Sequence, residues 1–265
     1  MIEHFSYGYL TLPIAFLVSM TGSALGLLMA RHARRHEQPG RRALWLAVAA
    51  FAIGGNGIWV MHFVAMLGFA VEDAELRYDP ALTALSALVA VAVVACGLLV
   101  IGLGRYSTLK LAVAGLFTGA GVAAMHYMGM AAVSTDVVLT HRPGYVAAAV
   151  AIAVVAATTA LWLSWRVQRA ASIWLAAVVM ALAVNLMHYT AMFGVATAGD
   201  STASAHGVDS MDLVFPMATL TAIAMLILVY TVVIVPTDAE MRTEARMTSL
   251  EGQLRRAADT PSSRT

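Results

Sequence analysis

Met187-His188-Tyr189-Thr190-Ala191-Met192 is the most complete of three copies of one pattern, Met-His-aromatic-x-x-Met. The other two copies are Met61-His62-Phe63-Val64-Ala65-Met66 and Met125-His126-Tyr127-Met128-Gly129-Met130. The second histidine follows the first by 64 residues and precedes the third by 62, and such a nearly fixed period indicates a duplicated structural unit. Each copy lies inside a long apolar run, where a histidine is a candidate functional residue.

The composition is that of a membrane protein. Hydrophobic residues make up 60% of the 265 residues and charged residues only 12%, and the mean hydropathy is +0.79. These values lie far from those of soluble globular proteins. The single cysteine, Cys96, excludes an intrachain disulfide and a thiolate-rich metal site. The first residues lack the basic segment of a secretory signal peptide, so we expect the first apolar run to be retained.

Seven runs without Asp, Glu, Lys or Arg are long enough to cross a hydrocarbon core of about 30 Å, which needs about 20 helical residues. They cover residues 5–30, 43–71, 81–104, 111–135, 143–165, 170–199 and 213–235. Lipid cannot satisfy open backbone groups, so we predict helices. The sequence therefore predicts an all-α polytopic membrane protein. Its domain, residues 1–235, would contain seven transmembrane helices, built as three repeated helix pairs followed by a seventh helix.

The basic residues predict the orientation. Of the 16 Lys and Arg residues, only Arg77 and Arg142 lie on one side of the predicted bilayer. The positive-inside rule then places the N-terminus outside and the C-terminus in the cytoplasm. Residues 236–265 are expected to form a short cytoplasmic tail, amphipathic at first and disordered at its end. The three motifs fall on the second, fourth and sixth helices at one depth, in the outer half of the bilayer.

The donor atoms of the motifs favour copper. On a helix, a histidine and the methionine four residues later share one face. Imidazole nitrogen with thioether sulfur suits Cu(I), whereas the scarcity of carboxylates disfavours calcium, magnesium or manganese. The candidate ligands are His62, His126, His188, Met61, Met66, Met125, Met130, Met187 and Met192. They exceed one four-coordinate site, so either a subset binds or more than one ion is present. Haem stays open as an alternative, because His and Met also serve as its axial ligands.

Other polar residues are expected to play supporting parts. We predict Tyr127 and Tyr189 to be hydrogen-bond partners around the site, or simply to pack there. Asn56 and Asn185 are buried amides, which we expect to form interhelical hydrogen bonds near it. His4, His141 and His206 lie on the outer side; we expect them to be solvated loop residues, with metal delivery as the alternative.

Three Met-His-Tyr-Thr-like motifs on alternate helices resemble the bacterial MHYT-domain family of integral membrane sensor proteins. The likeness covers roughly residues 7–235, and residues 187–190 match the namesake motif completely. The first copy departs from it at Phe63 and Val64, and the second at Met128. The resemblance implies copper bound near the outer face by the three motif histidines and neighbouring methionines. Oxygen, carbon monoxide and nitric oxide are the signals that it implies.

Members of that family often continue into cytoplasmic signalling domains, whereas this sequence ends 30 residues after the last apolar run. We therefore predict a sensor and signal-transducing module without enzymatic activity of its own. Either it would act on a cytoplasmic signalling partner in trans, or the chain is a fragment of a longer protein; we expect no nucleic-acid partner. Three alternatives stay open: a copper-handling protein that delivers or transports metal, a haem-binding membrane protein, and a purely structural scaffold.

Overall fold

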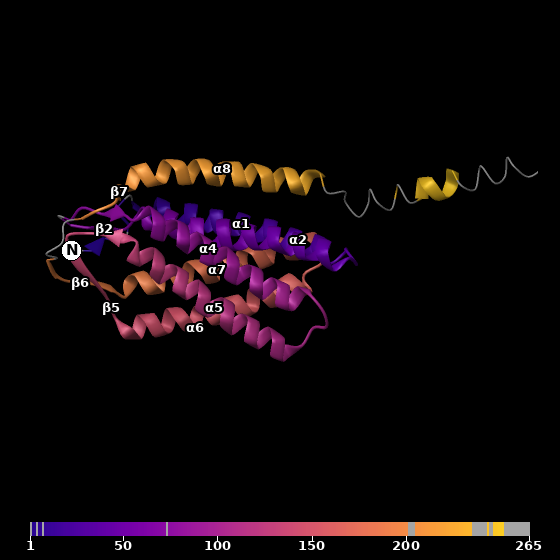
Figure 1. Cartoon of the computed structure of the whole chain (residues 1–265), viewed down its shortest axis with the longest axis horizontal. Coiled ribbons are helices and arrows are strands. Elements are labelled where there is room, and N and C mark those ends of the chain that lie inside the picture. The colour runs from indigo at the N-terminus through magenta and orange to yellow at the C-terminus, as the bar shows by residue number, and fades with distance from the viewer. Residues whose placement is uncertain are drawn as a thin grey trace, which may run out of the picture.

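The structure is a computed structural model that describes residues 2–3, 5–6, 8–72, 74–200, 205–234, 243 and 246–251. Long helices form the body of the molecule, and short strands lie at one end (Figure 1). The helices are η1 (Gly8–Leu10), α1 (Thr11–Ala33), α2 (Pro39–Ala50), the π-helix η2 (Phe51–Val60), α3 (Met61–Met66), α4 (Pro80–Gly102), α5 (Thr108–Ala131), α6 (Pro143–Arg166), α7 (Ala170–Phe193) and α8 (Ser210–Ile234).

Among the described residues, six helical segments are long and apolar enough to cross a membrane. They are Gly8–Ala33, Pro39–Met66, Pro80–Gly102, Thr108–Ala131, Pro143–Arg166 and Ala171–Phe193. The predicted all-α membrane fold is therefore confirmed. Each of the seven predicted apolar runs contains a helix, and the helix of the last run, α8, lies outside the bundle against α1 and η2 (Figure 1). The seventh span and the orientation of the termini stay predictions.

The spans form a closed ring in sequence order. α1 packs against α2 and η2, these pack against α4, and α4, α5, α6 and α7 follow in turn until α7 returns to α1. Some neighbouring backbones approach closely. A Cβ atom on Gly22 would lie 2.5 Å from the backbone nitrogen of Gly57 in η2, and one on Gly119 would lie 2.4 Å from the Cα of Val154 in α6. Small residues permit such contacts between membrane helices. The helices that carry the three motifs thus alternate with the other helices around the ring.

Proline begins three of the helices. Pro39, Pro80 and Pro143 stand at the first positions of α2, α4 and α6. Proline suits this position because its φ is already helical and the missing N–H would have no partner there. The carboxylate of Asp79 caps α4 by accepting hydrogen bonds from the backbone nitrogens of Ala81 and Leu82, at 2.8 and 3.0 Å. These signals fix where the three helices start: α4 and α6 at the end covered by strands, and α2 at the opposite end.

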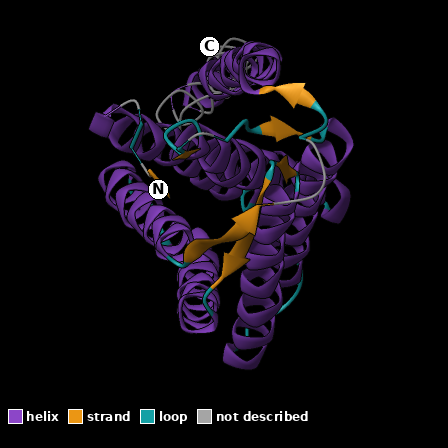
Figure 2. Cartoon of the chain, turned by 90° about the vertical axis from the view of Figure 1, so that its left-hand side faces the viewer, coloured by secondary structure: helices purple, strands orange, loops and turns teal. Residues whose placement is uncertain are grey.

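Antiparallel strands cover the end of the bundle that we predict to be outer (Figure 2). They are β1 (Ile2–Glu3) with β2 (Ala70–Val71), β3 (Arg77–Tyr78) between β4 (Val133–Ser134) and β7 (Val208–Asp209), and β5 (Val137–His141) with β6 (Val195–Asp200). The prediction that three of the helices continue to residues 71, 135 and 199 was wrong, because the chain forms strands before these residues are reached. Valine and threonine favour strands, and here the connections lie close enough to pair with each other.

An arginine joins two helices at the opposite end. Arg34 follows α1, and its guanidinium donates hydrogen bonds to the carbonyl oxygens of Ser164 and Val167 at the end of α6, the second with an Nη2–O distance of 2.7 Å. Burial, with Arg42 and Arg31 nearby, lowers the pKa of Arg34 to about 10. The side chain is therefore still charged at neutral pH. It satisfies carbonyl groups that the last turn of a helix leaves open.

Little of the predicted tail is described. Residues 246–251 are helical, and Met247 and Leu250 are exposed. Most of residues 236–265 lies outside the described residues, including the segment expected to be disordered, so the cytoplasmic tail stays a prediction.

Candidate metal centre

The histidines of the three motifs meet inside the bundle. His62 comes from α3, His126 from α5 and His188 from α7, and each is 1% exposed. The Nδ1 atom of His62 lies 3.1 Å from Nδ1 of His188 and 3.2 Å from Nδ1 of His126. One ring nitrogen from each residue lies within 4.8 Å of the other two. The structure thus brings together three candidate ligands that are far apart in the sequence.

The three rings meet through their edges. The ring centroids are 4.9, 5.0 and 5.3 Å apart, and the ring planes cross at 76° to 82°. Each imidazole is also close to perpendicular to the aromatic ring that follows it, at 82° for Phe63, 84° for Tyr127 and 83° for Tyr189. The three motifs therefore present their histidines in the same way, and nitrogen atoms rather than ring faces converge on the centre.

Hydrogen bonding alone does not account for this arrangement. An imidazole Nδ1 carries either one proton or one in-plane lone pair, so it can form one strong hydrogen bond, yet Nδ1 of His62 contacts two other nitrogens. Nitrogens bound at about 2.0–2.1 Å to one ion lie about 3.3–3.6 Å apart. The two short separations, 3.1 and 3.2 Å, are close to that range. The three residues therefore fit a shared metal ion.

The far ring nitrogens of two of these histidines have no hydrogen-bond partner among the described residues. They are the Nε2 atoms of His62 and His126, and both are buried. A buried polar atom without a partner destabilises a protein by about 1–3 kcal/mol. A bound ion would offset this destabilisation, because it binds the folded chain and raises its stability by mass action.

The six motif methionines are all buried, but they do not gather in one place. Met66, Met130 and Met192, four residues after each histidine, share one apolar cluster with Phe69 and Val195 near the strands. The other three are divided: Met61 packs in a separate small cluster, and Met125 and Met187 belong to the main core. The sulfur atoms that come together are therefore those of the later methionine of each motif, which we call the thioether layer.

The predicted supporting residues lie around the motifs in different ways. Asn56 donates to the carbonyl of Val18 in α1 at 3.5 Å, a long interhelical contact. The hydrogen bond of Asn185 differs from the expectation, because its amide donates to the carbonyl of Ala181, one turn earlier in its own helix, at 2.8 Å. The two tyrosines point to other aromatic rings.

Tyr127 and Tyr189 both have neighbours outside the three histidines. The Tyr127 ring lies 5.3 Å from the ring of His141, and the Tyr189 ring lies 5.8 Å from that of Phe5. The Tyr127 hydroxyl is buried without a hydrogen-bond partner among the described residues. Both tyrosines therefore border the site, and Tyr127 contacts β5 through His141.

Sequence reasoning missed one residue that shapes the site. A Cβ atom on Gly129 of α5 would lie 2.5 Å from Nε2 of His62 and 3.0 Å from its Cδ2. No side chain fits there, so the glycine allows the ring of His62 to lie against the backbone of the second motif. The only signal for this role in the sequence is the position of the glycine inside the motif itself.

Comparison with known proteins assigns the repeats to a family. The family described as MHYT, bacterial signalling protein N terminal repeat, matches residues 55–114 and 119–177. The bifunctional diguanylate cyclase/cyclic di-GMP phosphodiesterase MucR of Pseudomonas aeruginosa is 34% identical over 253 residues, which cover 92% of this chain and 36% of that protein. The cyclic di-GMP phosphodiesterase NbdA of the same organism is 35% identical over 197 residues, covering 72% of this chain and 25% of that protein.

A more distant relative is the signaling protein YkoW of Bacillus subtilis, 26% identical over 197 residues, which cover 71% of this chain and 24% of that protein. The chain thus spans about a third or less of the length of these relatives. No solved structure is significantly similar to it. Its apolar helices and its relatives together make it a multi-pass protein of the bacterial inner membrane. With both repeats matched and the three motifs assembled at one centre, the chain belongs to the MHYT-domain family of bacterial integral membrane sensor proteins.

Proposed function

We propose that this chain is a copper-dependent sensor module, in which His62, His126 and His188 hold the metal. It would respond to a diatomic gas (oxygen, carbon monoxide or nitric oxide) or to the redox state of the copper. The observation that carries the proposal is the convergence of three buried Nδ1 atoms from three helices. Copper held by these imidazoles would supply a centre that changes oxidation state and takes a diatomic ligand.

The chain's own residues provide suitable surroundings for such an ion. Neutral imidazoles can be buried at lower cost than carboxylates or ammonium groups. The thioether layer of Met66, Met130 and Met192 lies between the histidines and the strands and keeps water away. Thioether sulfur also favours Cu(I) over harder cations. We infer that the sulfur atoms of these three methionines can bind the ion together with the three histidine nitrogens.

A small cavity within the bundle supports the gas as a signal. Its volume is about 40 Å³, and its lining includes Val122, Val184 and Met187 with only two hydroxyl-bearing residues, Ser23 and Thr118. A water molecule needs two to four polar partners to be stable in a cavity of this size. An uncharged diatomic molecule needs none. Met187 directly precedes His188 in the third motif, so the cavity reaches the residue before one of the proposed ligands.

We propose that the signal leaves through the arginine-rich side of the membrane. With α8 as a seventh span, the C-terminal residues and the connection between α1 and α2 would both be cytoplasmic, as the positive-inside rule predicts. The relatives are described as a diguanylate cyclase and phosphodiesterases. We propose that this chain itself has no enzymatic activity and acts on such an output domain or partner.

The test is the metal content of the full chain, purified from copper-replete membranes without chelator. We expect about one copper per chain, and its loss when His62, His126 and His188 are all replaced by alanine. The matched control replaces His32 and His36, a neighbouring histidine pair with an Nε2–Nε2 distance of 3.1 Å at the other end of the bundle. That variant should keep its copper.

Other outcomes would point to the alternatives. A Soret absorption band lost in the triple variant would replace copper by haem. Copper flux across vesicle membranes would replace sensing by transport. Copper retained in the triple variant but lost in the His32/His36 control would contradict the assigned site.

A further inference from the structure

An open cavity lies beside the second motif at the end covered by strands. Its volume is about 590 Å³. Tyr127 and Met130 of α5 line its inner part, and His141 of β5 and His206 of the loop before β7 also line it. We call it the vestibule. It connects the surface near the strands with residues adjacent to His126, and it contains imidazole and thioether groups but few carboxylates.

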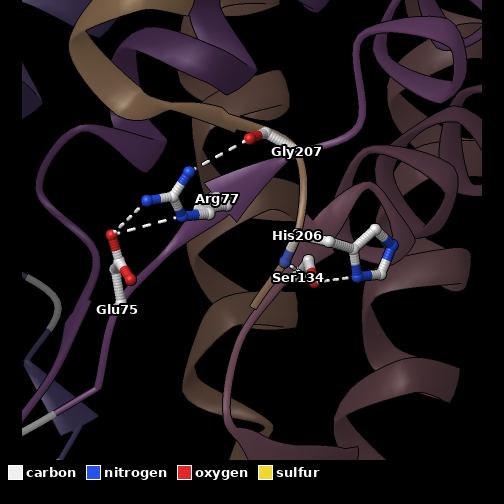
Figure 3. A network of polar contacts seen from close by, with 5 residues as sticks. All are labelled: Glu75, Arg77, Ser134, His206 and Gly207. Carbon is white, nitrogen blue, oxygen red and sulfur yellow. Dashed lines mark hydrogen bonds and ion pairs between the residues drawn. The ribbon is translucent and has the colours of Figure 1, made fainter. Parts of the chain in front are cut away.

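Hydrogen bonds fix the rim of the vestibule (Figure 3). Nδ1 of His206 lies 2.9 Å from Oγ of Ser134, and the backbone nitrogen of His206 donates to the same oxygen at 3.1 Å. Arg77 binds the carbonyl of Gly207 at 3.3 Å and the carboxylate of Glu75 at 2.7 Å. His206 is therefore held against the wall by its neighbours, and Nε2 is the ring nitrogen that Ser134 leaves available.

The glycine of the rim permits a close approach. Gly207 has φ +114°, and a Cβ atom there would lie 2.4 Å from the carbonyl oxygen of Tyr78. A residue with a side chain would be strained in this conformation and would collide with β3. The loop that carries His206 can therefore lie directly on β3, beside Ser134 of β4.

His141 stands between the rim and the motif. Its Nε2 atom is buried without a hydrogen-bond partner among the described residues. Its ring lies 5.3 Å from that of Tyr127, and it is near enough to His126 to interact with it electrostatically. Burial lowers the pKa of His141 below its ordinary value of 6.5, so the imidazole is neutral at physiological pH. Neutral imidazole is the form that binds metal.

Met130 completes the path. It is 3% exposed, lines the vestibule and belongs to the thioether layer. It also follows His126 by four residues and therefore shares its helix face. Asp79 lines the vestibule too, but its carboxylate accepts two backbone hydrogen bonds at the start of α4. Besides the hydroxyl groups of Tyr127, Ser134 and Thr135, the donors along the wall are the imidazole nitrogens of the two histidines and the thioether sulfur of Met130.

We propose that the vestibule is the route by which a soft metal ion enters from the outer side, with His206, His141 and Met130 as successive transient ligands. This inference rests on the proposed metal site. Each step exchanges one donor atom for the next around the same ion, so the ion keeps its oxidation state. The order follows the decreasing exposure of the three residues, from the rim to the thioether layer.

The test compares the rate of metal uptake with the final metal content. Copper would be given as Cu(I) in a weak complex, without oxygen, to the full metal-free chain, and uptake would be followed by competition with a coloured chelator. For the variant His141→Ala/His206→Ala we expect uptake slower by about tenfold, a barrier change of about 1.4 kcal/mol. The final copper content should equal that of the unmodified chain. The His32→Ala/His36→Ala variant, which changes two histidines outside the vestibule, should load at the normal rate.

A second variant separates passage from ligation. Thr135 lines the vestibule, so Thr135→Trp should obstruct it without removing a donor atom. Slow uptake in both variants supports the proposed route. Slow uptake in Thr135→Trp alone shows a passage without histidine ligands and overturns the proposal, as does normal uptake in both. If the unmodified chain holds no copper at equilibrium, the proposed function fails first, and the final metal content distinguishes that result from failure of the route.

Discussion

The first motif lies on a different kind of helix from the other two. The second and third motifs are parts of the continuous α-helices α5 and α7, whereas the first follows the ten-residue π-helix η2. The relation between each histidine and the next aromatic ring is nevertheless the same, with centroid distances of 4.8, 5.0 and 5.0 Å. The orientation of the histidine relative to the next aromatic ring is thus the same in all three repeats, although the helix that precedes the first motif differs.

The difference between the repeats concerns the contacts of the histidines. His62 is the residue whose Nδ1 has a short contact to both others, and its ring lies against Gly129 of the second motif. The rings of His126 and His188 are the most widely separated pair, at 5.3 Å. π-Helical turns are frequent at functional sites. We infer that η2 places His62 between the other two and makes the first repeat the centre of the site.

The largest effect should come from removing that centre. His62→Ala should weaken copper binding by about 100-fold or more, since loss of even an outer-shell partner of a metal ligand costs about 10–100-fold. His188→Ala should weaken it less, because His62 and His126 keep their 3.2 Å contact. Competition with a Cu(I) chelator measures both affinities. Equal losses would show that the three repeats contribute equally and would contradict the central place of His62.

Filling the space beside His62 should have the next largest effect. Gly129→Ala would place a methyl group 2.5 Å from Nε2 of His62 and should destabilise the chain by about 1–3 kcal/mol, as overpacking does. Copper affinity should fall with it, because the ring must turn away. Gly144→Ala is the control, since a Cβ there meets nothing within 4 Å. Thermal unfolding with and without copper measures both variants, and an unchanged Gly129→Ala would mean that α5 yields to the added group.

Substitutions within η2 should have a smaller effect on the site. A Cβ on Gly54 would lie 2.7 Å from the carbonyl oxygen of Ala90 in α4, whereas one on Gly55 would meet nothing nearer than 3.6 Å. Gly54→Ala should therefore lower the free energy of unfolding by about 1–3 kcal/mol, and Gly55→Ala should leave it nearly unchanged. The melting temperature of the metal-free protein measures this. Equal melting temperatures would show that the π-helix does not need its close contact with α4.

The smallest effect should be a pH dependence of stability that arises in the second repeat. There the ring of Tyr127 contacts that of His141, whereas in the first repeat the ring of Phe63 contacts that of Tyr78. Burial lowers the pKa of His141 in the folded chain below 6.5, so the unfolded chain binds more protons at acidic pH. The contribution of His141 to the free energy of unfolding is therefore complete above pH 6.5 and decreases as the pH falls from there through the lowered pKa. His141→Gln should reduce that decrease in melting temperature. An identical pH profile in the variant would assign the effect to other groups.

The sequence was sufficient for the body of the fold and for the three histidines. Long apolar runs require helices in a membrane, and the repeated motif located His62, His126 and His188 before their contacts were known. Hydropathy could not show where the helices end, because Val71, Val133 and Val195 are as apolar in a strand as in a helix. It also could not reveal η2, since a π-helix differs from an α-helix in hydrogen bonding and not in composition.

The close contacts of the site depend on the packing between helices far apart in the sequence. Nothing around Gly129 indicates that a ring from α3 lies on it, and nothing around His206 indicates its bond to Ser134. His141 and His206 were expected to be solvated loop residues; His206 is exposed in a loop, whereas His141 is partly buried in β5, and both line a defined cavity. Their positions result from strands that pair across three different connections, and a single sequence carries little signal for such pairing.

The Arg34 contact has a mechanical consequence. It fastens the end of α1 to the end of α6, two helices from different repeats, by hydrogen bonds from a charged donor, which are among the strongest in proteins. At the opposite end the helices meet around three histidines, whose spacing would change if they bound the proposed metal ion. A change in that spacing should therefore tilt the helices relative to one another, with the end held by Arg34 as the pivot. The loops near the strands would travel farthest, and the helix ends beside Arg34 would mainly rotate.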